Sequence, residues 1–489
     1  MSEDIFKKVV SHAKEYGFVF PSSEIYDGLA AVYDYGQNGV ELKNNLRQYW
    51  WKAMVQMHEN IVGIDAAIFM HPKTWKASGH IDGFSDPMID NKDSKKRYRA
   101  DQLLEDKIAK YEKENKSNKA TELQTALDKA MLDNDLVGLK QLIETHEIAC
   151  PISGTKNWTD VRQFNLMFST EMGAMAEDAD KIYLRPETAQ GIFVNYLNVQ
   201  KTGRMKIPFG IAQTGKAFRN EIIARQFIMR MREFEQMEMQ FFVRPGTQKQ
   251  WYEYWKEARL KWHKKLGLGD ANYRFHDHVK LAHYADAAVD IEFNFPFGFK
   301  ELEGIHSRTD FDLKNHQELS GKKLQYNDQE LDENGKPFGV YIPYVVETSV
   351  GLDRLFLSVL CATYKEEEVG DGDKKDTRVV MQFPPILAPY KVAIFPLTKK
   401  DGLPELANQI MKDLKCDYTC FYEEKDAIGK RYRRQDALGT PFCITVDHES
   451  LENQTVTIRY RDTMQQERIP IASIKEILAK EINWSKLLA

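Results

Sequence analysis

The stretch Phe218-Arg219-Asn220-Glu221, followed after a short loop by Arg230-Met231-Arg232-Glu233-Phe234-Glu235-Gln236-Met237-Glu238, is the most informative part of this chain. Residues two apart in an extended chain share a face. On the two strands of a hairpin, Arg219 and Glu221 would project together, as would Arg232, Phe234, Gln236 and Glu238. Such a pair of strands could bind a nucleotide: the guanidinium could pair with a phosphate, the carboxylate could accept from the adenine amino group, and the aromatic ring could stack on the base. The alternative is a pair of edge strands with polar faces.

A second motif lies further along, at Val346-Glu347-Thr348-Ser349-Val350-Gly351-Leu352-Asp353-Arg354-Leu355. The pattern predicts a strand that turns at Gly351 into an apolar helix. Arg354 then lies in the first helical turn and points to the mouth of the sheet, where a triphosphate could lie. A solvated arginine at a helix start is the alternative.

The totals describe a globular chain. It has 489 residues, enough for two to four domains, with 42% hydrophobic and 29% charged residues. No run approaches the roughly 18 apolar residues of a membrane helix, and no export signal is visible. Five cysteines without a CxxC pair predict free thiols in a reducing cytoplasm and no structural zinc. Because the formal net charge is -5, a nucleic acid would need a local basic patch.

The pattern along the chain predicts an α+β fold with an antiparallel sheet. A long amphipathic helix is expected over 38–61 and a short strand over 64–70. Dense charge and helical periodicity predict a helical insertion over 91–147, and another charged helix is expected over 247–266. A charged loop at 366–377 and the prolines after it mark a boundary. The predicted domains are 1–90, 91–147, 148–385 with a further insertion at about 245–285, and an α/β module over 386–489. In that module we expect strands over 391–396, 418–422, 442–446 and 455–460 and helices over 402–414 and 428–438.

Together these two motifs and the long amphipathic helix before them resemble the three signature motifs of class II aminoacyl-tRNA synthetases, in the right order. Within that class, the two quoted motifs and three further stretches resemble the homodimeric glycyl-tRNA synthetase family: Arg185 to Phe193, Glu301 to Ile305 and Arg308 to Leu313. The resemblance runs from about Ser11 to the C-terminus. It implies a class II synthetase-like antiparallel sheet flanked by helices, with a C-terminal anticodon-binding domain. Two positions differ from residues common in the family: an aromatic residue often stands in place of Glu303, and Ala-Asp in place of His306-Ser307.

The resemblance also implies roles for individual residues. Arg219 and Arg354 would be catalytic, Arg219 on the α-phosphate and Arg354 on adenine and the γ-phosphate. Glu301 would lie near ATP and its Mg²⁺. The implied ATP-binding set is Arg219, Asn220, Glu221, Met229, Arg230, Met231, Arg232, Glu233, Phe234, Glu301, Leu302, Gly351, Leu352, Asp353 and Arg354. The implied glycine-binding set is Arg99, Glu187, Phe234, Glu235, Gln236, Met237, Glu238, Arg308, Glu347, Thr348, Ser349, Val350 and Gly351.

The expected activity is therefore ATP-dependent activation of glycine and its transfer to the 3′ end of tRNA(Gly), by a cytoplasmic homodimer. Basic residues interleaved with Tyr422 and Tyr432 suit a single-stranded RNA loop. Two alternatives stay open: a class II synthetase for another small amino acid, and a non-catalytic, synthetase-like nucleic-acid-binding subunit, such as the accessory subunit of the mitochondrial DNA polymerase. The expected tRNA-binding residues are Lys425, Lys430, Arg431, Arg433 and Arg434.

Overall fold

A computed structural model describes residues 2–173, 180–222, 226–278, 281, 284–370 and 376–489. Two compact units form in it. The first contains residues 1–68, 187–217 and 224–489, and the second contains 69–186 and 218–223. No helix of the described residues is both long and apolar enough to cross a membrane.

The centre of the first unit is a sheet in which, within the described ranges, seven strands pair in the order β11-β12-β13-β16-β10-β9-β3. Neighbouring strands from β11 to β13, and β13 with β16 and β16 with β10, are antiparallel, whereas β3 runs parallel to β9. The α+β class and the antiparallel sheet are thus confirmed. The strands are β3 (Ile61–Gly63), β9 (Phe209–Phe218), β10 (Glu233–Val243), β11 (Tyr273–Asp277), β12 (Ala287–Phe295), β13 (Gly298–Thr309) and β16 (Tyr344–Gly351).

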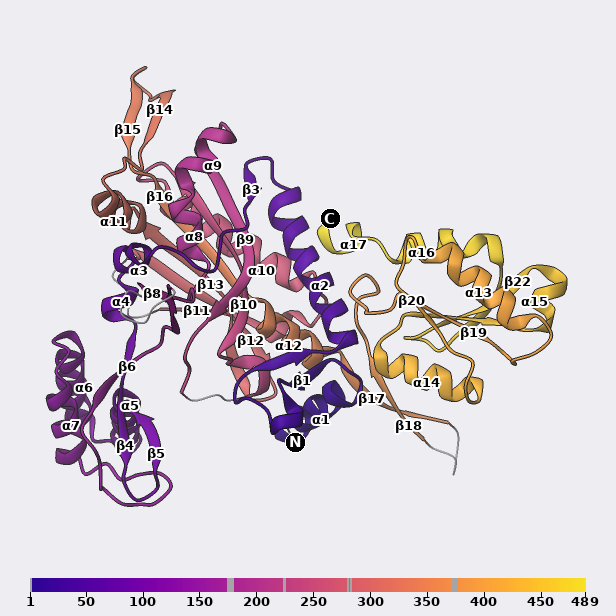
Figure 1. Cartoon of the computed structure of the whole chain (residues 1–489), viewed down its shortest axis with the longest axis horizontal. Coiled ribbons are helices and arrows are strands. Elements are labelled where there is room, and N and C mark those ends of the chain that lie inside the picture. Colours follow the sequence, from indigo (N-terminus) through magenta and orange to yellow (C-terminus); the bar gives the residue numbers. More distant parts are fainter. Residues whose placement is uncertain (1, 174–179, 223–225, 279–280, 282–283, 371–375) are drawn as a thin grey trace. The chain divides into compact units, whose positions relative to one another are not determined.

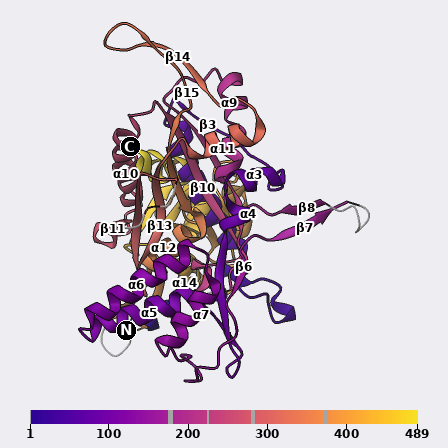
Figure 2. The same ribbon diagram turned by 90° about the vertical axis from the view of Figure 1, so that its left-hand side faces the viewer.

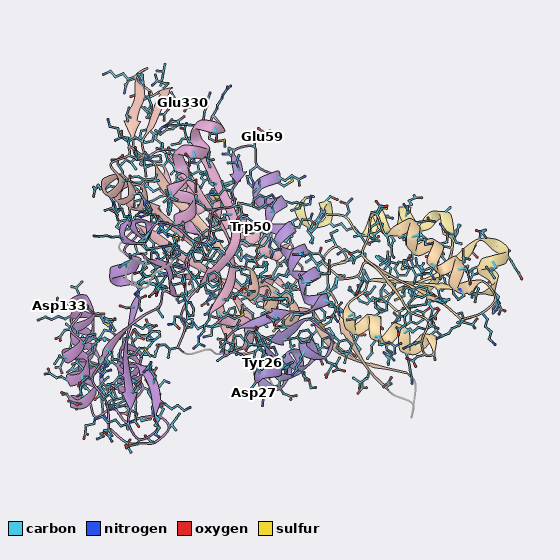
Figure 3. All side chains as sticks on the ribbon, in the orientation of Figure 1. Tyr26, Asp27, Trp50, Glu59, Asp133 and Glu330 are labelled. Carbon is cyan, nitrogen blue, oxygen red and sulfur yellow. The ribbon has the colours of Figure 1, made fainter. Side chains whose placement is uncertain are left out.

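Helices α10 (Gln248–Lys264) and α12 (Leu352–Thr363) pack against this sheet, and α2 (Gln37–Trp51) packs against α12 (Figure 1). Trp50 of α2, labelled in Figure 3, is fully buried in the shared core. α2 continues as a π-helix over Lys52–Gln56, and Ile61 already belongs to β3. The expected helix over 38–61 is therefore wrong at its end, because pairing with β9 takes Ile61–Gly63 into the sheet. The expected strand over 64–70 is wrong as well, because this range forms only an isolated bridge at Phe69.

Smaller elements complete the first unit. The loop expected at 366–377 is wrong in part: β17 and β18 pair as a hairpin there, while residues 371–375 lie outside the described ones. A second hairpin, β14 with β15, extends beyond the sheet in Figure 1. These elements are α1 (Ser2–Glu15), β1 (Val19–Pro21), β2 (Tyr33–Tyr35), α8 (Ala189–Val194), α9 (Tyr196–Thr202), α11 (Phe311–Ser320), β14 (Tyr326–Leu331), β15 (Pro337–Tyr341), β17 (Tyr364–Val369) and β18 (Asp376–Met381).

The C-terminal module is a five-stranded sheet, in the order β20-β19-β21-β22-β23, with helices α13 to α16. Three expected elements have the predicted bounds: α14 (Ile428–Leu438), β21 (Phe442–Val446) and β22 (Thr455–Tyr460). The others are β19 (Val392–Pro396), α13 (Leu403–Leu414), β20 (Cys420–Tyr422), α15 (His448–Asn453), β23 (Gln466–Pro470), α16 (Ile474–Glu481) and α17 (Ser485–Leu488).

The second unit contains the expected charged helices, grouped in Figure 2 as α5 (Ala100–Lys113), α6 (Ser117–Leu132) and α7 (Leu136–Thr145). They enclose an apolar core that includes Leu104, Leu123 and Ile143. A three-stranded sheet of β5, β4 and β6 accompanies them, so the unit is wider than the expected 91–147. Its other elements are α3 (Pro72–Ala77), α4 (His80–Gly83), β4 (Ser85–Asn91), β5 (Lys96–Arg99), β6 (Arg162–Asn165), β7 (Ser169–Met172) and β8 (Asp180–Tyr183).

Candidate active site

Two glutamates lie side by side on adjacent central strands. Glu238 of β10 is opposite Ser349 of β16, and Gln240 is opposite Glu347. The Gln240 side-chain amide donates to both carboxylates, at 2.8 Å to Glu238 Oε1 and 2.6 Å to Glu347 Oε2. Because the side chains of a strand alternate between faces, these four residues share one face of the sheet. We call Glu238, Gln240, Glu347 and Ser349 the acidic row.

Burial and neighbouring charges shift the pKa values of the two glutamates in opposite directions. Burial, followed by the charges of Glu347 and Glu187, raises the pKa of Glu238 well above its ordinary value. Burial also opposes ionisation of Glu347, but Arg308 and His306 outweigh it and lower its pKa. We therefore treat Glu347 as the ionised member of the pair and Glu238 as the protonated one.

A buried network of charges and amides supports the row. Arg308 donates from NH1 to Glu347 Oε2 at 2.9 Å, and from Nε to Asp312 Oδ2 at 2.8 Å. Gln190, at the start of α8, donates to Asp312 and to Glu187, both at 3.0 Å. The structure thus places Glu187, Arg308 and Glu347, all expected from the sequence, in one connected group.

Short polar side chains lie beside the carboxylates. The Gln236 amide donates to Ser349 Oγ at 3.2 Å, and the Thr188 hydroxyl donates to Glu238. The space next to the acidic row is therefore lined by hydroxyl, amide and carboxylate groups, which suit an ammonium ligand.

Four residues expected to contact glycine have side chains on the opposite face of the sheet from the acidic row. For these four residues, the expected side-chain contact with glycine is wrong. Glu235, Met237, Thr348 and Val350 alternate with the acidic row and are buried towards the helices. Glu235 pairs there with Lys43 and Arg47 of α2, at 3.3 and 2.7 Å.

Several expected ATP contacts also have structural roles instead. Asp353 is buried and accepts from Lys43 Nζ at 2.8 Å and from the Glu235 backbone N–H at 2.7 Å. The side chains of four other expected ATP contacts are buried in the apolar core: Met229, Met231, Leu302 and Leu352.

Arg354 and Glu301 meet at the start of α12. Arg354 NH1 lies 2.9 Å from Glu301 Oε2, and Arg354 Nε donates to the Met229 carbonyl at 3.3 Å. The side chains of Arg354 and Glu301 are 28% and 48% exposed, so both groups are open to a ligand. Phe234 is half-buried at the edge of the core, two residues before Gln236, and Gly351 ends β16 and caps α12.

The remaining residues of the first motif are not all on strands. β9 ends at Phe218, so Arg219, Asn220 and Glu221 follow it in irregular chain, and the expected two-strand arrangement is wrong for them. They belong to the second unit, where Arg219 Nε donates to the Pro186 carbonyl at 3.0 Å. Arg99, in the same unit, pairs with Asp101 at 2.5 Å.

Residues 230–233 lead into β10. Arg230 is exposed, Arg232 NH1 donates to the Ala30 carbonyl at 3.0 Å, and Glu233 pairs with Lys216. Arg232 and Glu233 are thus engaged by the protein at the entrance to the strand.

On the helix side of the sheet, Glu303 occupies the position where the family often has an aromatic residue. It is fully buried, and α10 supplies its partners: Arg259 Nε at 2.6 Å and His263 Nε2 at 2.7 Å. Burial opposes ionisation, but Arg259 and His263 outweigh it and lower the pKa of Glu303. The protein therefore accommodates a glutamate at this position by pairing it with Arg259 and His263.

Comparisons with known proteins agree with this architecture. The family model described as anticodon binding domain matches residues 391–481, and the one described as glycyl-tRNA synthetase insertion domain 1 matches 86–122 and 115–166. A glycine–tRNA ligase of Chlorobaculum tepidum is 53% identical over 477 residues, which are 97% of this chain and 99% of the relative. That of Macrococcus caseolyticus is 52% identical over 486 residues, covering 99% and 100%.

The chain belongs to the glycine–tRNA ligase family. A solved structure of prolyl-tRNA synthetase from Cryptosporidium parvum aligns with it at a TM-score of 0.58, over 98% of this chain and 78% of that one. At 13% identity this likeness concerns the fold alone, and it confirms the class II synthetase architecture. The charged helical unit corresponds to the insertion domain of glycyl-tRNA synthetases.

The anticodon-binding domain of this ligase holds the basic cluster, which we define as Lys425, Lys430, Arg431, Arg433 and Arg434. Lys425 and Lys430 are exposed. Arg431 is 2% exposed and donates to the backbone carbonyls of Pro396, Leu397 and Glu423, so its expected RNA contact is wrong.

The other arginines of the basic cluster, and its aromatic neighbour Tyr432, are engaged within the domain. Arg434 pairs with Glu423 at 2.7 Å, and Arg433 lies 3.5 Å from Asp376. Tyr432 is buried against Phe395, so it offers no ring for a base to stack on. Lys425 and Lys430 are left as the most accessible cations of the basic cluster.

Sequence reasoning missed the residues that organise the ligase's acidic row: Thr188, Gln190, Gln240 and Asp312. Two of them had a signal. Gln240 continues the alternation of Gln236 and Glu238, and Asp312 is an acidic residue four positions after Arg308, across the junction of β13 and α11. Thr188 and Gln190 lie within the stretch Arg185 to Phe193, but that stretch did not indicate this role, because the role depends on which strand α8 meets.

Proposed function

We propose that this ligase joins glycine to ATP as glycyl-adenylate with release of pyrophosphate, and then transfers glycine to the 3′ end of tRNA(Gly). The family membership supports the ligase reaction. The observation that carries the choice of amino acid is the acidic row, where Glu238 and Glu347 are joined through one amide and lie next to Glu187. Burial and the neighbouring carboxyl groups disfavour ionisation of Glu238, and the ammonium group of glycine is a cation that would stabilise its ionised form.

In this proposal the ammonium group binds between Glu187, Glu238 and Glu347. Arg308 already donates to Glu347 and Asp312, yet each of its terminal nitrogens carries a second N–H that can bind the glycine carboxylate. Ser349 and Gln236 occupy the space that a larger side chain would need. Steric exclusion rejects larger amino acids strongly, so no editing site is required.

Adenylate formation needs the glycine carboxylate oxygen to attack the α-phosphorus while the bond to pyrophosphate breaks. Both reactants are anions, so the protein has to offset their repulsion and the charge that develops in line. We assign this role to Arg354 and Arg219, with Glu221 and Phe234 on the adenine. Arg99, in the second unit, is retained as an expected glycine contact.

The residues at the start of α12 fit a Mg²⁺ ion that arrives with ATP. Glu301 offers a half-exposed carboxylate, and oxygen is the ligand that Mg²⁺ prefers. When bound, the ion would neutralise phosphate charge. Arg354, which pairs with Glu301 here, would then turn to the phosphates.

Three further parts of the proposal concern location and partners. We place the ligase in the cytoplasm, where its free thiols stay reduced, and propose a homodimer. For the tRNA anticodon we propose Lys425, Lys430, Arg433 and Arg434, with Arg431 removed from the expected set.

ATP–pyrophosphate exchange with glycine, alanine and serine tests the amino-acid assignment. Exchange that depends on glycine alone is expected, and it also separates the ligase from a non-catalytic relative. If alanine or serine supports exchange as fast as glycine does, the proposed specificity is wrong. Glu187→Gln should raise the KM for glycine much more than the KM for ATP.

A further inference from the structure

Two histidines and one aspartate converge beside the acidic row, and the proposed reaction gives none of them a contact with a substrate. Asp290 lies on β12, His306 on β13, and His278 directly follows β11. One ligand atom from each lies within 4.8 Å of the other two, and His278 Nε2 is 2.9 Å from Asp290 Oδ2. All three side chains are partly buried.

The backbone brings these side chains together on neighbouring strands. The His278 N–H donates to the Ala288 carbonyl at 3.1 Å, and Ala288 is the cross-strand neighbour of His306. Asp290 is the neighbour of Gly304. A Cβ at Gly304 would come within 3.0 Å of His306 Cε1 and 3.6 Å of Asp290 Oδ1. The glycine thus leaves the space in which the imidazole and the carboxylate approach each other.

A hydrogen bond to Glu347 also fixes the orientation of the His306 ring. Its Nδ1 donates to Glu347 Oε1 at 2.7 Å, and Glu347 is itself held by Arg308 and Gln240. A histidine that binds a metal through one nitrogen usually donates its other ring N–H to a carboxylate, which fixes the tautomer and the ring plane. The Nδ1 contact assigns Nε2 of His306 as the metal-binding atom.

We propose that His278, Asp290 and His306 bind a divalent transition-metal ion, for which Zn²⁺ is the best fit. Two imidazoles and one carboxylate are ligands that Zn²⁺ favours, and three protein ligands leave a fourth position open. Mg²⁺ and Ca²⁺ prefer sites made wholly of oxygen ligands. The cysteine pattern could not reveal such a site, because its ligands are histidine and aspartate from separate strands.

Metal binding by the full-length chain tests this directly. After treatment with a chelator, the protein is dialysed against Zn²⁺ and the bound metal is measured by mass spectrometry. One ion per chain is expected. His306→Ala and Asp290→Asn should each weaken binding by at least about tenfold. The matched control is His448→Ala, because His448 Nε2 pairs with Asp401 Oδ2 at 3.0 Å in the same manner on the anticodon-binding domain.

If one of the ligand variants does not fold, a further variant and a further measurement still test metal binding. Gly304→Ala retains all three ligands but adds a Cβ between them, so it should also weaken metal binding. Co²⁺ in place of Zn²⁺ should give intense visible absorption bands in the wild type and in His448→Ala, but not in His306→Ala or Asp290→Asn.

Two results overturn the proposal. One is a wild-type protein that retains no Zn²⁺, and the other is His306→Ala with undiminished binding; either would show that the histidines form ion pairs only. Glycine-dependent exchange that persists in the wild-type preparation without bound Zn²⁺ would leave the proposed ligase reaction intact, so the two failures are distinguishable.

Discussion

At the scale of single residues, the site is organised by which carboxyl group holds a proton. Gln240 donates to both glutamates, but Arg308 and His306 support the charge of Glu347, whereas Glu238 is buried beside Glu347 and Glu187. The raised pKa of Glu238 and the lowered pKa of Glu347 follow from this difference in surroundings. The pair can therefore accept a cation without an initial cost of two adjacent negative charges.

The first prediction concerns the proton on Glu238. A bound ammonium group favours the ionised carboxylate, so glycine binding should release a proton below the raised pKa of Glu238, and the KM for glycine should fall as the pH rises towards that pKa. Calorimetry in buffers of different ionisation enthalpy measures the proton release. Glu238→Gln should abolish it. Equal binding enthalpies in all buffers for the wild type would contradict the assignment.

The second prediction concerns Arg354. Arg354→Ala should lower ATP–pyrophosphate exchange at least about 100-fold, because a lost charge on the phosphates costs roughly 3 kcal/mol in the transition state. Arg274→Ala is the matched control, since Arg274 also pairs with a glutamate, Glu292, at 2.6 Å on the same sheet. Similar exchange rates in both variants would remove Arg354 from the reaction.

At the scale of elements, the periodicity of apolar residues predicted the bounds of a helix or strand correctly where the element packs through one buried face. The bounds of α14, β21 and β22 were predicted correctly because apolar residues repeat along one buried face. Prediction was wrong at the end of α2, where pairing with β9 decides, and for Glu235 and Met237, which were grouped by motif although a strand sends alternate residues to opposite faces.

The third prediction concerns α14 and the loop before it. Lys425→Glu with Lys430→Glu should weaken tRNA binding and reduce its salt dependence by roughly 0.7 in log–log slope for each lost phosphate contact. Arg431→Glu should act differently, since its guanidinium holds three carbonyls in the domain interior. It should lower the thermal stability of the domain. Unchanged tRNA affinity in the lysine variants would place anticodon binding elsewhere.

At the scale of the whole molecule, the ligase combines a catalytic sheet, an insertion domain and an anticodon-binding domain. The family, its fold and the two large domains could be predicted from sequence because their motifs are contiguous. The hydrogen bonds of Arg308 with Asp312, and of Gln240 with two glutamates, could not be predicted from sequence. They depend on how segments that are far apart in the chain come together in the fold.

The fourth prediction is the homodimer. Trp50 on α2 is fully buried in its own unit, whereas Val40 at the start of the same helix is 41% exposed and Met57, just past its π-helical extension, is 58% exposed. Apolar residues outside the core suit a two-fold contact. Light scattering should therefore give about twice the chain mass of 56.8 kDa. Val40→Glu with Met57→Glu should shift the mass towards that of one chain. An active wild-type monomer would contradict the dimer.

The alternation along β16 also restricts how this gene can change in length. Losing the codon for Val346 would turn Glu347 towards the core and Thr348 towards the acidic row, because every later side chain of the strand changes face. The tip of the β14–β15 hairpin, at Asp332 to Lys336, has no such constraint, since its side chains are exposed or half-exposed and few backbone bonds depend on it. Insertions and deletions should therefore survive selection at that tip and be purged from β16.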